Sequence, residues 1–176
     1  MTIRRLACWV AVAVLLCGLA GPTGATSRRT LSAAVERVSD GDTVVAVTDD
    51  ATKLRIRLLG IDAPEIPHGK APGQPLGAEA QQYLERLVGH RSVRLESFGP
   101  DVYKRMLAVI WVDGKNVNLE MVRAGLAEVY RGSRCQAYCR ELAEAEGRAQ
   151  RAHLGIWTQP GYESPATYRK RLRMAS

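Results

Sequence analysis

Alternating basic and apolar residues over Lys53–Leu59 constrain the fold more than any other feature of the sequence. This period of two predicts a strand with one buried face, and it places Arg57 on the opposite face, where we expect an exposed side chain. A Val-rich run, Asp42–Thr48, precedes it, and the Asp49-Asp50 pair between the two segments is a turn signal. The two segments therefore predict a β-hairpin.

Two further strands and three helices complete the predicted elements. Arg91–Glu96 and Met106–Val112 predict strands, and the second stops at the tight-turn signal Asp113-Gly114. Apolar stripes with helical spacing, together with capping residues and glycine stop signals, predict the helices. The residues that mark them are Ala80, Tyr83, Leu84, Leu87 and Val88 before Gly89, then Asn116 before Gly125, then Leu142, Ala145, Ala149 and Ala152 before Gly155.

Length and charge limit the kind of protein. The 176 residues suit one domain with a single core, and a net charge of +7 favours anionic partners such as nucleic acid or a membrane surface. The Gly- and Pro-rich stretch Glu65–Gly77 is either a mobile binding element or a plain connection. The basic tail Tyr168–Arg173 predicts a solvated chain end that makes at most non-specific phosphate contacts.

The first 25 residues have the parts of an export signal. Arg4 and Arg5 precede the uncharged apolar stretch Leu6–Ala20, and small residues follow as candidate cleavage positions. The stretch is short for a transmembrane span, although an uncleaved anchor stays open as the alternative. We expect a secretion signal at 1–25, a folded domain at 26–160 and a basic tail at 161–176, in a secreted or periplasmic protein.

Cysteine usage agrees with export. Cys8 and Cys17 lie inside the expected signal, so only Cys135 and Cys139 remain in the folded domain. In an oxidising compartment an isolated pair favours a disulfide. A redox or metal role is the alternative, but the three histidines show no zinc-finger spacing.

Residues suited to phosphodiester hydrolysis gather in three short segments, each of which alone has a plain interpretation as a turn. Asp42 and Asp62 can supply oxygen ligands to a hard cation such as calcium. Glu65 can help to deprotonate a water molecule. Arg57 and Arg105 can stabilise negative charge in the transition state, because a guanidinium contacts two phosphate oxygens at once. The segments are Asp40–Thr43, Arg57–Glu65 and Asp101–Arg105.

Together the three segments resemble staphylococcal nuclease-like proteins (thermonucleases) in composition and in order. The matching runs are Asp-Gly-Asp-Thr from Asp40, Arg-Leu-Leu-Gly-Ile-Asp-Ala-Pro-Glu from Arg57, Asp-x-Tyr-x-Arg from Asp101, Val117-Asn118, Gly125-Leu126-Ala127 and Leu154-Gly155-Ile156-Trp157. The resemblance covers about Val35–Trp157. It implies an α+β, mainly β fold, namely an OB-type five-stranded barrel with about three helices.

The resemblance also implies roles for single residues. The implied calcium ligands are Asp42, Asp62 and the backbone carbonyl of Ala63, the catalytic residues are Arg57, Glu65 and Arg105, Tyr103 contacts substrate phosphate, and Asp40 lies near the metal site. We add Lys104 as a substrate-binding residue and Thr43 as a neighbour of the site, since both lie within the matching segments. Lys104 stands where the family usually has glycine, so Arg105 is re-aimed if that position needs a positive φ. Val102 stands where a basic residue is usual, and Lys104 can replace that charge.

The sequence therefore predicts a secreted, calcium-dependent endonuclease that acts on DNA and RNA, and the resemblance implies that its products end in a 3′-phosphate. We expect a monomer with no stable protein partner, and no membrane contact unless the signal is uncleaved. One alternative is a non-catalytic OB-fold module that binds single strands and stacks bases on Tyr103, Trp111 and Tyr130. The other alternative is a surface-anchored or partner-binding protein that uses the basic tail.

Overall fold

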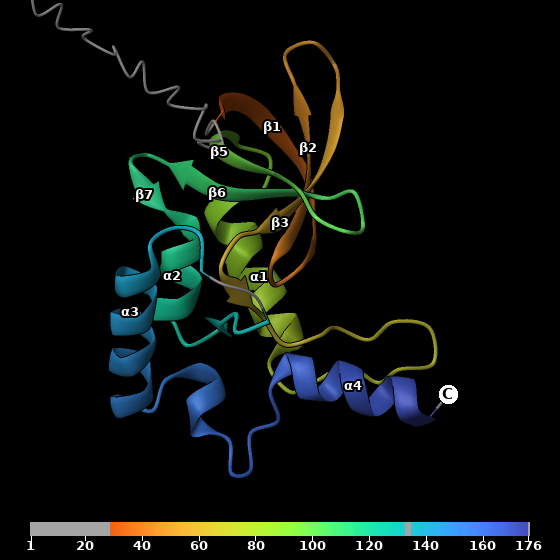
Figure 1. The fold of residues 1–176 in the computed structure, drawn as a ribbon, viewed down its shortest axis with the longest axis vertical. Helices are drawn as coiled ribbons and strands as arrows, with labels where there is room; N and C mark the ends of the chain where they lie inside the picture. The colour runs from red at the N-terminus through yellow and green to blue at the C-terminus, as the bar shows by residue number, and fades with distance from the viewer. Residues whose placement is uncertain (1–28, 133–134, 176) are drawn as a thin grey trace, which may run out of the picture.

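The computed structural model describes residues 29–132 and 135–175, so the expected export signal lies outside the described residues. Figure 1 shows a β-barrel with helices at one end and one side. No helix in the described part of the chain is long and apolar enough to span a membrane. The elements in chain order are β1 (Arg29–Asp40), β2 (Thr43–Thr48), β3 (Lys53–Leu58), β4 (Ile61–Asp62), α1 (Gly77–Val88), β5 (Ser92–Pro100), β6 (Met106–Val112), β7 (Lys115–Asn116), α2 (Val117–Arg123), β8 (Glu128–Val129), α3 (Cys139–Arg151), the 3-10 helix η1 (Gly155–Thr158) and α4 (Pro165–Ala175).

Five strands close into the barrel. Antiparallel pairing joins β3, β2, β1, β5 and β6 in that order, and a parallel pairing between β3 and β6 closes the ring. The predicted hairpin is confirmed as β2 and β3, with Thr43 opposite Arg57. The short β7 extends the sheet, while β4 and β8 form a separate two-stranded sheet. The α+β, OB-type barrel expected from the sequence is therefore confirmed.

The longest strand, β1, is absent from the sequence-based prediction. It pairs with both β2 and β5, and its register shifts between Val35 and Arg37 and again between Val38 and Asp40. Each shift interrupts the period of two that marks a strand in a sequence. The same irregularities bend β1, which lets one strand take part in both halves of the barrel.

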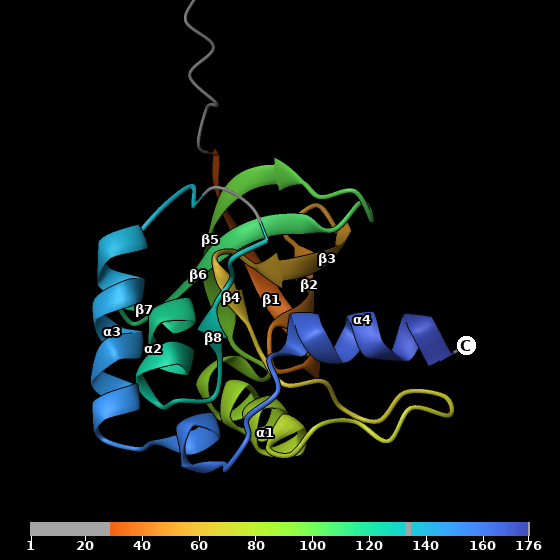
Figure 2. The same ribbon diagram turned by 60° about the horizontal axis from the view of Figure 1, so that its bottom comes forward.

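One apolar core fills the barrel and continues beneath helix α1. Ile56, Leu58, Leu95 and Ile110 from the strands and Leu84 from α1 are all fully buried. Helix α1 covers one end of the barrel, and α2 and α3 pack together at its side (Figures 1 and 2). The described residues hold four α-helices, one more than expected, because the C-terminal tail is helical.

Asn118 ties the strands that carry the site to the helices. This buried side chain accepts a hydrogen bond from the backbone N–H of Ile110 and donates to the carbonyls of Leu59 and Ala108. It therefore satisfies backbone groups just beyond the end of β3 and within β6, where the barrel closes. The end of β3 is held in this way next to the short strand β4.

Local signals for turns and caps are confirmed. Asp113 and Gly114 both have positive φ, at 49° and 74°, as a tight hairpin turn between β6 and β7 requires. The side chain of Asn116 accepts a hydrogen bond from the backbone N–H of Leu119 over 3.1 Å and so caps α2. One position differs from the prediction: Ala152, expected on the buried stripe of α3, follows the helix and is exposed.

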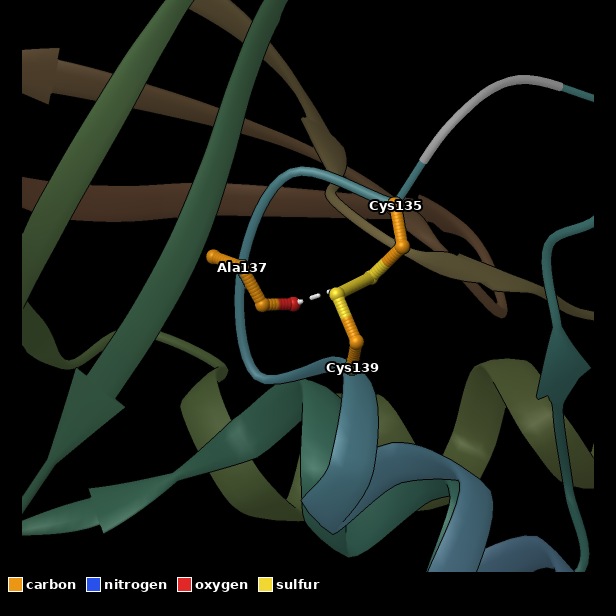
Figure 3. Close-up of a disulfide and its surroundings, with 3 residues drawn as sticks. All are labelled: Cys135, Ala137 and Cys139. Carbon is orange, nitrogen blue, oxygen red and sulfur yellow. Dashed lines mark hydrogen bonds between the residues drawn. A yellow bond between two sulfur atoms is a disulfide. The ribbon is translucent and has the colours of Figure 1, made fainter.

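Cys135 and Cys139 form a disulfide, as their isolation in the sequence predicts. Their Cα atoms lie 5.9 Å apart, and Cys139 is the first residue of α3 (Figure 3). The bridge closes a short loop directly before the helix. It thereby links the start of α3 to Cys135.

Candidate active site

Two carboxylates meet one guanidinium beside the end of the β2–β3 hairpin. Asp42 lies in the β1–β2 turn, and Asp62 belongs to β4, just beyond the end of β3. The pairing of Thr43 with Arg57 brings the turn beside this arginine, and Leu58 N donates to the carbonyl of Asp42 over 2.8 Å. Nη1 of Arg57 contacts Oδ1 of Asp42, and Nη2 donates to Oδ1 of Asp62 over 2.8 Å.

Arg57 is largely covered by its neighbours, and the expectation of an exposed side chain is wrong. It lies on the face predicted by the strand period, but its side chain is only 12% exposed, because the residues around Asp42 and Asp62 cover that face. Burial lowers the pKa of the Arg57 guanidinium below its ordinary value, and the nearby Asp62 carboxylate opposes this shift. The arginine is thus a fixed, desolvated cation between two carboxylates.

Backbone and hydroxyl groups also fix Asp42. Its Oδ1 accepts from the Thr43 hydroxyl over 3.1 Å, and its Oδ2 accepts from the N–H of Ala63 over 2.9 Å. Gly41 permits this close approach, because a Cβ there would lie 2.6 Å from the Cβ of Ala63 and 2.8 Å from that of Ala80. Only a residue without a side chain fits the turn at this point.

Asp40 borders the same group of charges. Its Oδ1 accepts from the backbone N–H of Asp42 over 3.0 Å. Burial raises the pKa of Asp40, while the charges of Arg57 and Arg105 act to lower it. Asp40 therefore shapes the turn and lies within electrostatic reach of both predicted catalytic arginines.

A second guanidinium reaches the carboxylates from helix α4. Arg169 forms a fork on Asp62, with Nη1 at 3.0 Å from Oδ1 and Nη2 at 2.8 Å from Oδ2. Its Nη1 also lies 2.6 Å from Oε1 of Glu65. Burial alone would lower the pKa of Arg169, but its hydrogen bonds to the two carboxylates raise it above the ordinary value. Arg169 thus joins Asp62 to Glu65, a contact that the sequence analysis missed.

Helix α4 also contradicts the interpretation of the tail as a solvated end. The Tyr168 ring is buried, and its hydroxyl accepts from the backbone N–H of Gly73 over 3.1 Å. Gln74 donates to the carbonyl of Glu163 over 2.8 Å and accepts from the backbone N–H of Glu65 over 3.1 Å. The helix lies along the Gly- and Pro-rich loop in both views (Figures 1 and 2). The tail and the loop are therefore one packed unit beside the carboxylates.

The turn between β5 and β6 holds the second predicted arginine. Lys104 has a φ of 61°, in the left-handed region that favours glycine, at a cost of about 1–2 kcal/mol for other residues. Nε of Arg105 donates to Oδ2 of Asp101 over 2.7 Å, and its guanidinium carbon lies 5.4 Å from the ring centroid of Tyr103. The positive φ at Lys104, which we gave as the condition for a re-aimed Arg105, is present. The Arg105 side chain donates a hydrogen bond to Asp101.

Strand register nevertheless keeps this turn beside the carboxylate group. Leu107 pairs with Arg57 across β3 and β6, so Arg105, two residues earlier, lies on the same face of the barrel as Arg57. Val102 and Tyr103 are 90% and 74% exposed at the tip of the turn. Burial acts to raise the pKa of Asp101, but hydrogen bonds from Arg105 and Tyr103 hold it below the ordinary value. The turn thus presents an ordered, exposed aromatic ring next to the site.

The predicted metal ligands suit a hard cation in their chemistry. Asp42 and Asp62 are carboxylates that face a common point, the Arg57 guanidinium, and calcium prefers such oxygen donors. Among the described residues, however, no group of three or more His, Cys, Asp or Glu side chains is arranged to hold a metal ion. The ligand roles of Asp42, Asp62 and the Ala63 carbonyl therefore stay predictions.

Comparison with known proteins establishes the family. Residues 55–159, which carry Arg57, Asp62, Glu65 and Arg105, match the family described as staphylococcal nuclease homologue. The chain belongs to the staphylococcal nuclease family. The turn at Asp42 and the two barrel strands that it joins, β1 and β2, precede the matched range.

Relatives of this staphylococcal nuclease homologue occur in bacteria and fungi. An uncharacterized endonuclease of Haemophilus influenzae is 34% identical over 148 residues, which are 83% of this chain and 77% of that protein. Probable endonucleases named LCL3 are 35% identical over 132 residues in Botryotinia fuckeliana and 38% identical over 131 residues in Verticillium alfalfae. These matches cover 70% and 67% of this chain but 50% and 44% of the fungal proteins. The chain thus spans half or less of those fungal relatives.

Proposed function

We propose that this staphylococcal nuclease homologue is a secreted, calcium-dependent endonuclease that hydrolyses phosphodiester bonds of DNA and RNA. The convergence of Asp42, Arg57, Asp62 and Glu65 at one edge of the barrel carries the proposal. Membership of the family and the endonuclease names of the relatives support a nuclease. No side chain of the predicted site is a dedicated reader of the 2′-hydroxyl, so we expect both sugars to be accepted.

In the proposed reaction Glu65 acts as the general base. A calcium ion held by Asp42 and Asp62 would neutralise charge on the phosphate and orient a water molecule. Glu65 lies three residues beyond Asp62 with a side chain 30% exposed, so solvent can reach it. It takes a proton from the attacking water, whose oxygen bonds to phosphorus. The bond from phosphorus to the 5′ oxygen breaks, and that oxygen takes a proton from solvent. The products carry 3′-phosphate and 5′-hydroxyl ends.

The two predicted catalytic arginines act by charge. A guanidinium keeps its proton at neutral pH and is a poor acid, so Arg57 and Arg105 stabilise the negative charge that develops on the phosphate oxygens. Arg57 is already fixed and desolvated, which strengthens its interaction with a phosphate. Arg105 reaches the phosphate by exchanging its bond to Asp101 for one to the substrate.

A non-catalytic OB-fold module fits these side chains less well. Of the three aromatic residues expected to stack bases, Trp111 packs edge-to-face on Tyr138 with ring centroids 5.9 Å apart, and Arg94 covers its ring at 4.8 Å. Tyr103 and Tyr130 remain as large exposed rings. Carboxylates beside the binding surface would also repel phosphates unless a cation lies between them.

A cleavage assay tests the proposal. The purified protein is incubated with single-stranded DNA and with RNA, in calcium and in excess chelator, and acid-soluble product is followed. We expect cleavage of both polymers in calcium, none in chelator, and 3′-phosphate ends by mass spectrometry. Cleavage that is equally fast in chelator would overturn the calcium dependence. Tight binding of single strands without any cleavage would favour the binding module.

Export is the remaining part of the proposal. It is supported by the arginine pair, the apolar stretch and the small residues within positions 1–25. We expect the exported protein to lack these residues, and intact mass measurement of protein recovered outside the cytoplasm checks this. An intact mass that retains the first 25 residues would favour the anchored alternative.

A further inference from the structure

Helix α4 places a guanidinium on two carboxylates that the proposed reaction needs free. Each oxygen of Asp62 is bonded to one terminal nitrogen of Arg169, and Glu65 is bonded to the same side chain. The Asp62 side chain is only 1% exposed, so it has little access to any other cation while Arg169 is in place. A divalent cation and this guanidinium both need the carboxylate oxygens of Asp62, and their positive charges repel each other.

Apart from the ion pairs of Arg169, few contacts hold helix α4 on the domain. Pro165 and Tyr168 are its only buried residues, and none of its residues belongs to the two apolar clusters that form the core in the described part of the chain. Its remaining hydrogen bonds to the Gly- and Pro-rich loop are the one from Gly73 to the Tyr168 hydroxyl and the one from Gln74 to the carbonyl of Glu163, just before the helix. Segments with few buried apolar contacts open at low cost in free energy. Helix α4 can therefore leave the barrel while the core stays folded.

The ion pairs of Arg169 thus have two effects. They keep other cations away from Asp62, and they are a main attachment of helix α4 to the rest of the domain. Arg169 has one-third of its side chain exposed, so solvent weakens its interaction with Glu65 more than that with the buried Asp62. A cation that competes for Asp62 removes the stronger of the two contacts. Loss of that contact leaves the helix attached through the weaker pair with Glu65, the buried ring of Tyr168 and the hydrogen bonds to the loop.

We propose that α4 is an autoinhibitory cap and that Arg169 is a tethered competitor of the divalent cation at Asp62. The capped state holds Asp62 and Glu65 in ion pairs, and the active state has α4 displaced. Calcium favours the displaced state, because it binds only where Arg169 has left. This inference rests on the proposed calcium-dependent function, and it adds a device that the proposed reaction does not itself require.

Calcium titration by calorimetry tests the cap without relying on cleavage. We expect Arg169→Met to bind calcium about tenfold more tightly than the wild type, because a site that is only partly available binds with an affinity reduced by that fraction. Lys170→Met is the matched control, since it removes one charge from the adjacent, exposed position of the same helix. It should bind calcium as the wild type does. Tyr168→Ala, which removes the apolar anchor and touches no carboxylate, should also bind calcium more tightly.

Amide hydrogen exchange of the wild type gives a second readout that needs no variant. We expect saturating calcium to raise exchange in residues 165–175 and to leave the barrel strands protected. Equal calcium affinity of wild type, Arg169→Met and Tyr168→Ala, with α4 still protected in calcium, overturns the cap and leaves the calcium-dependent nuclease intact. No heat of calcium binding in any variant overturns both the cap and the calcium dependence of the proposed function.

Discussion

Replacing Glu65 with glutamine is expected to slow DNA cleavage by about 10²–10⁴-fold, the range for loss of a positioned general base. Glutamine keeps the size of the side chain, and its carbonyl oxygen can still accept a hydrogen bond from Arg169. It cannot take a proton from water at neutral pH. The rate of acid-soluble product release in calcium measures the loss, and thermal melting should show an intact fold because the Glu65 side chain is partly exposed and glutamine has the same size.

A control variant at another carboxylate distinguishes loss of the general base from the general effect of removing one negative charge. Glu36 lies on β1, is half exposed, and pairs with Lys53 on the surface of the barrel. Glu36→Gln makes the same chemical change outside the proposed site, so its cleavage rate should match that of the wild type. Cleavage by Glu65→Gln at the wild-type rate would show that another group, or hydroxide from solvent, activates the water.

Periodicity located the strands that carry the site because those strands are regular. The alternation that predicts β3 survives in the structure, where Ile56 and Leu58 face the core and Arg57 does not. The same reasoning did not predict β1, because two register shifts within this strand break the alternation. A pattern with period two detects regular strands and fails on a bent one, which OB-type barrels use to close.

The environment of Arg57 shows what periodicity leaves open. The strand period gives the face on which a side chain lies, but it does not say what covers that face. Here the turn at Asp42 and the short strand at Asp62 cover it, and they come from positions on both sides of β3 in the sequence. The chemistry of the residues predicted which groups belong to one site, and the fold shows how closely their side chains are packed.

Arg169 illustrates a contact that local patterns do not encode. It lies 107 residues from Asp62 in sequence, on a helix with two buried residues and hence almost no apolar stripe. A run of basic residues at a chain end is compatible with solvation everywhere along its length. The buried Tyr168 beside it was the one available signal, because an aromatic ring within a charged run often packs against the domain.

Replacing Arg57 with methionine is expected to destabilise the protein by about 3–5 kcal/mol in chelator, the usual cost of removing one partner of a buried ion pair. Asp62 would keep its fork from Arg169, so Asp42 carries most of the cost. Only the Thr43 hydroxyl and the Ala63 N–H would still stabilise the buried Asp42 carboxylate. Denaturant unfolding at neutral pH, monitored by circular dichroism, measures the difference from the wild type.

Calcium should restore part of the stability lost by Arg57→Met, because a cation bound to the folded state alone stabilises it and would take over the missing positive charge. Arg55→Met is the matched control, since Arg55 is exposed on the same face of β3 and the same change there should cost within about 0.5 kcal/mol. Restoration by calcium in Arg57→Met but not in Arg55→Met would tie the cation to the two carboxylates. An equal effect of calcium on both variants would mean that the cation binds elsewhere, and a cost below about 1 kcal/mol for Arg57→Met would contradict the buried ion pair itself.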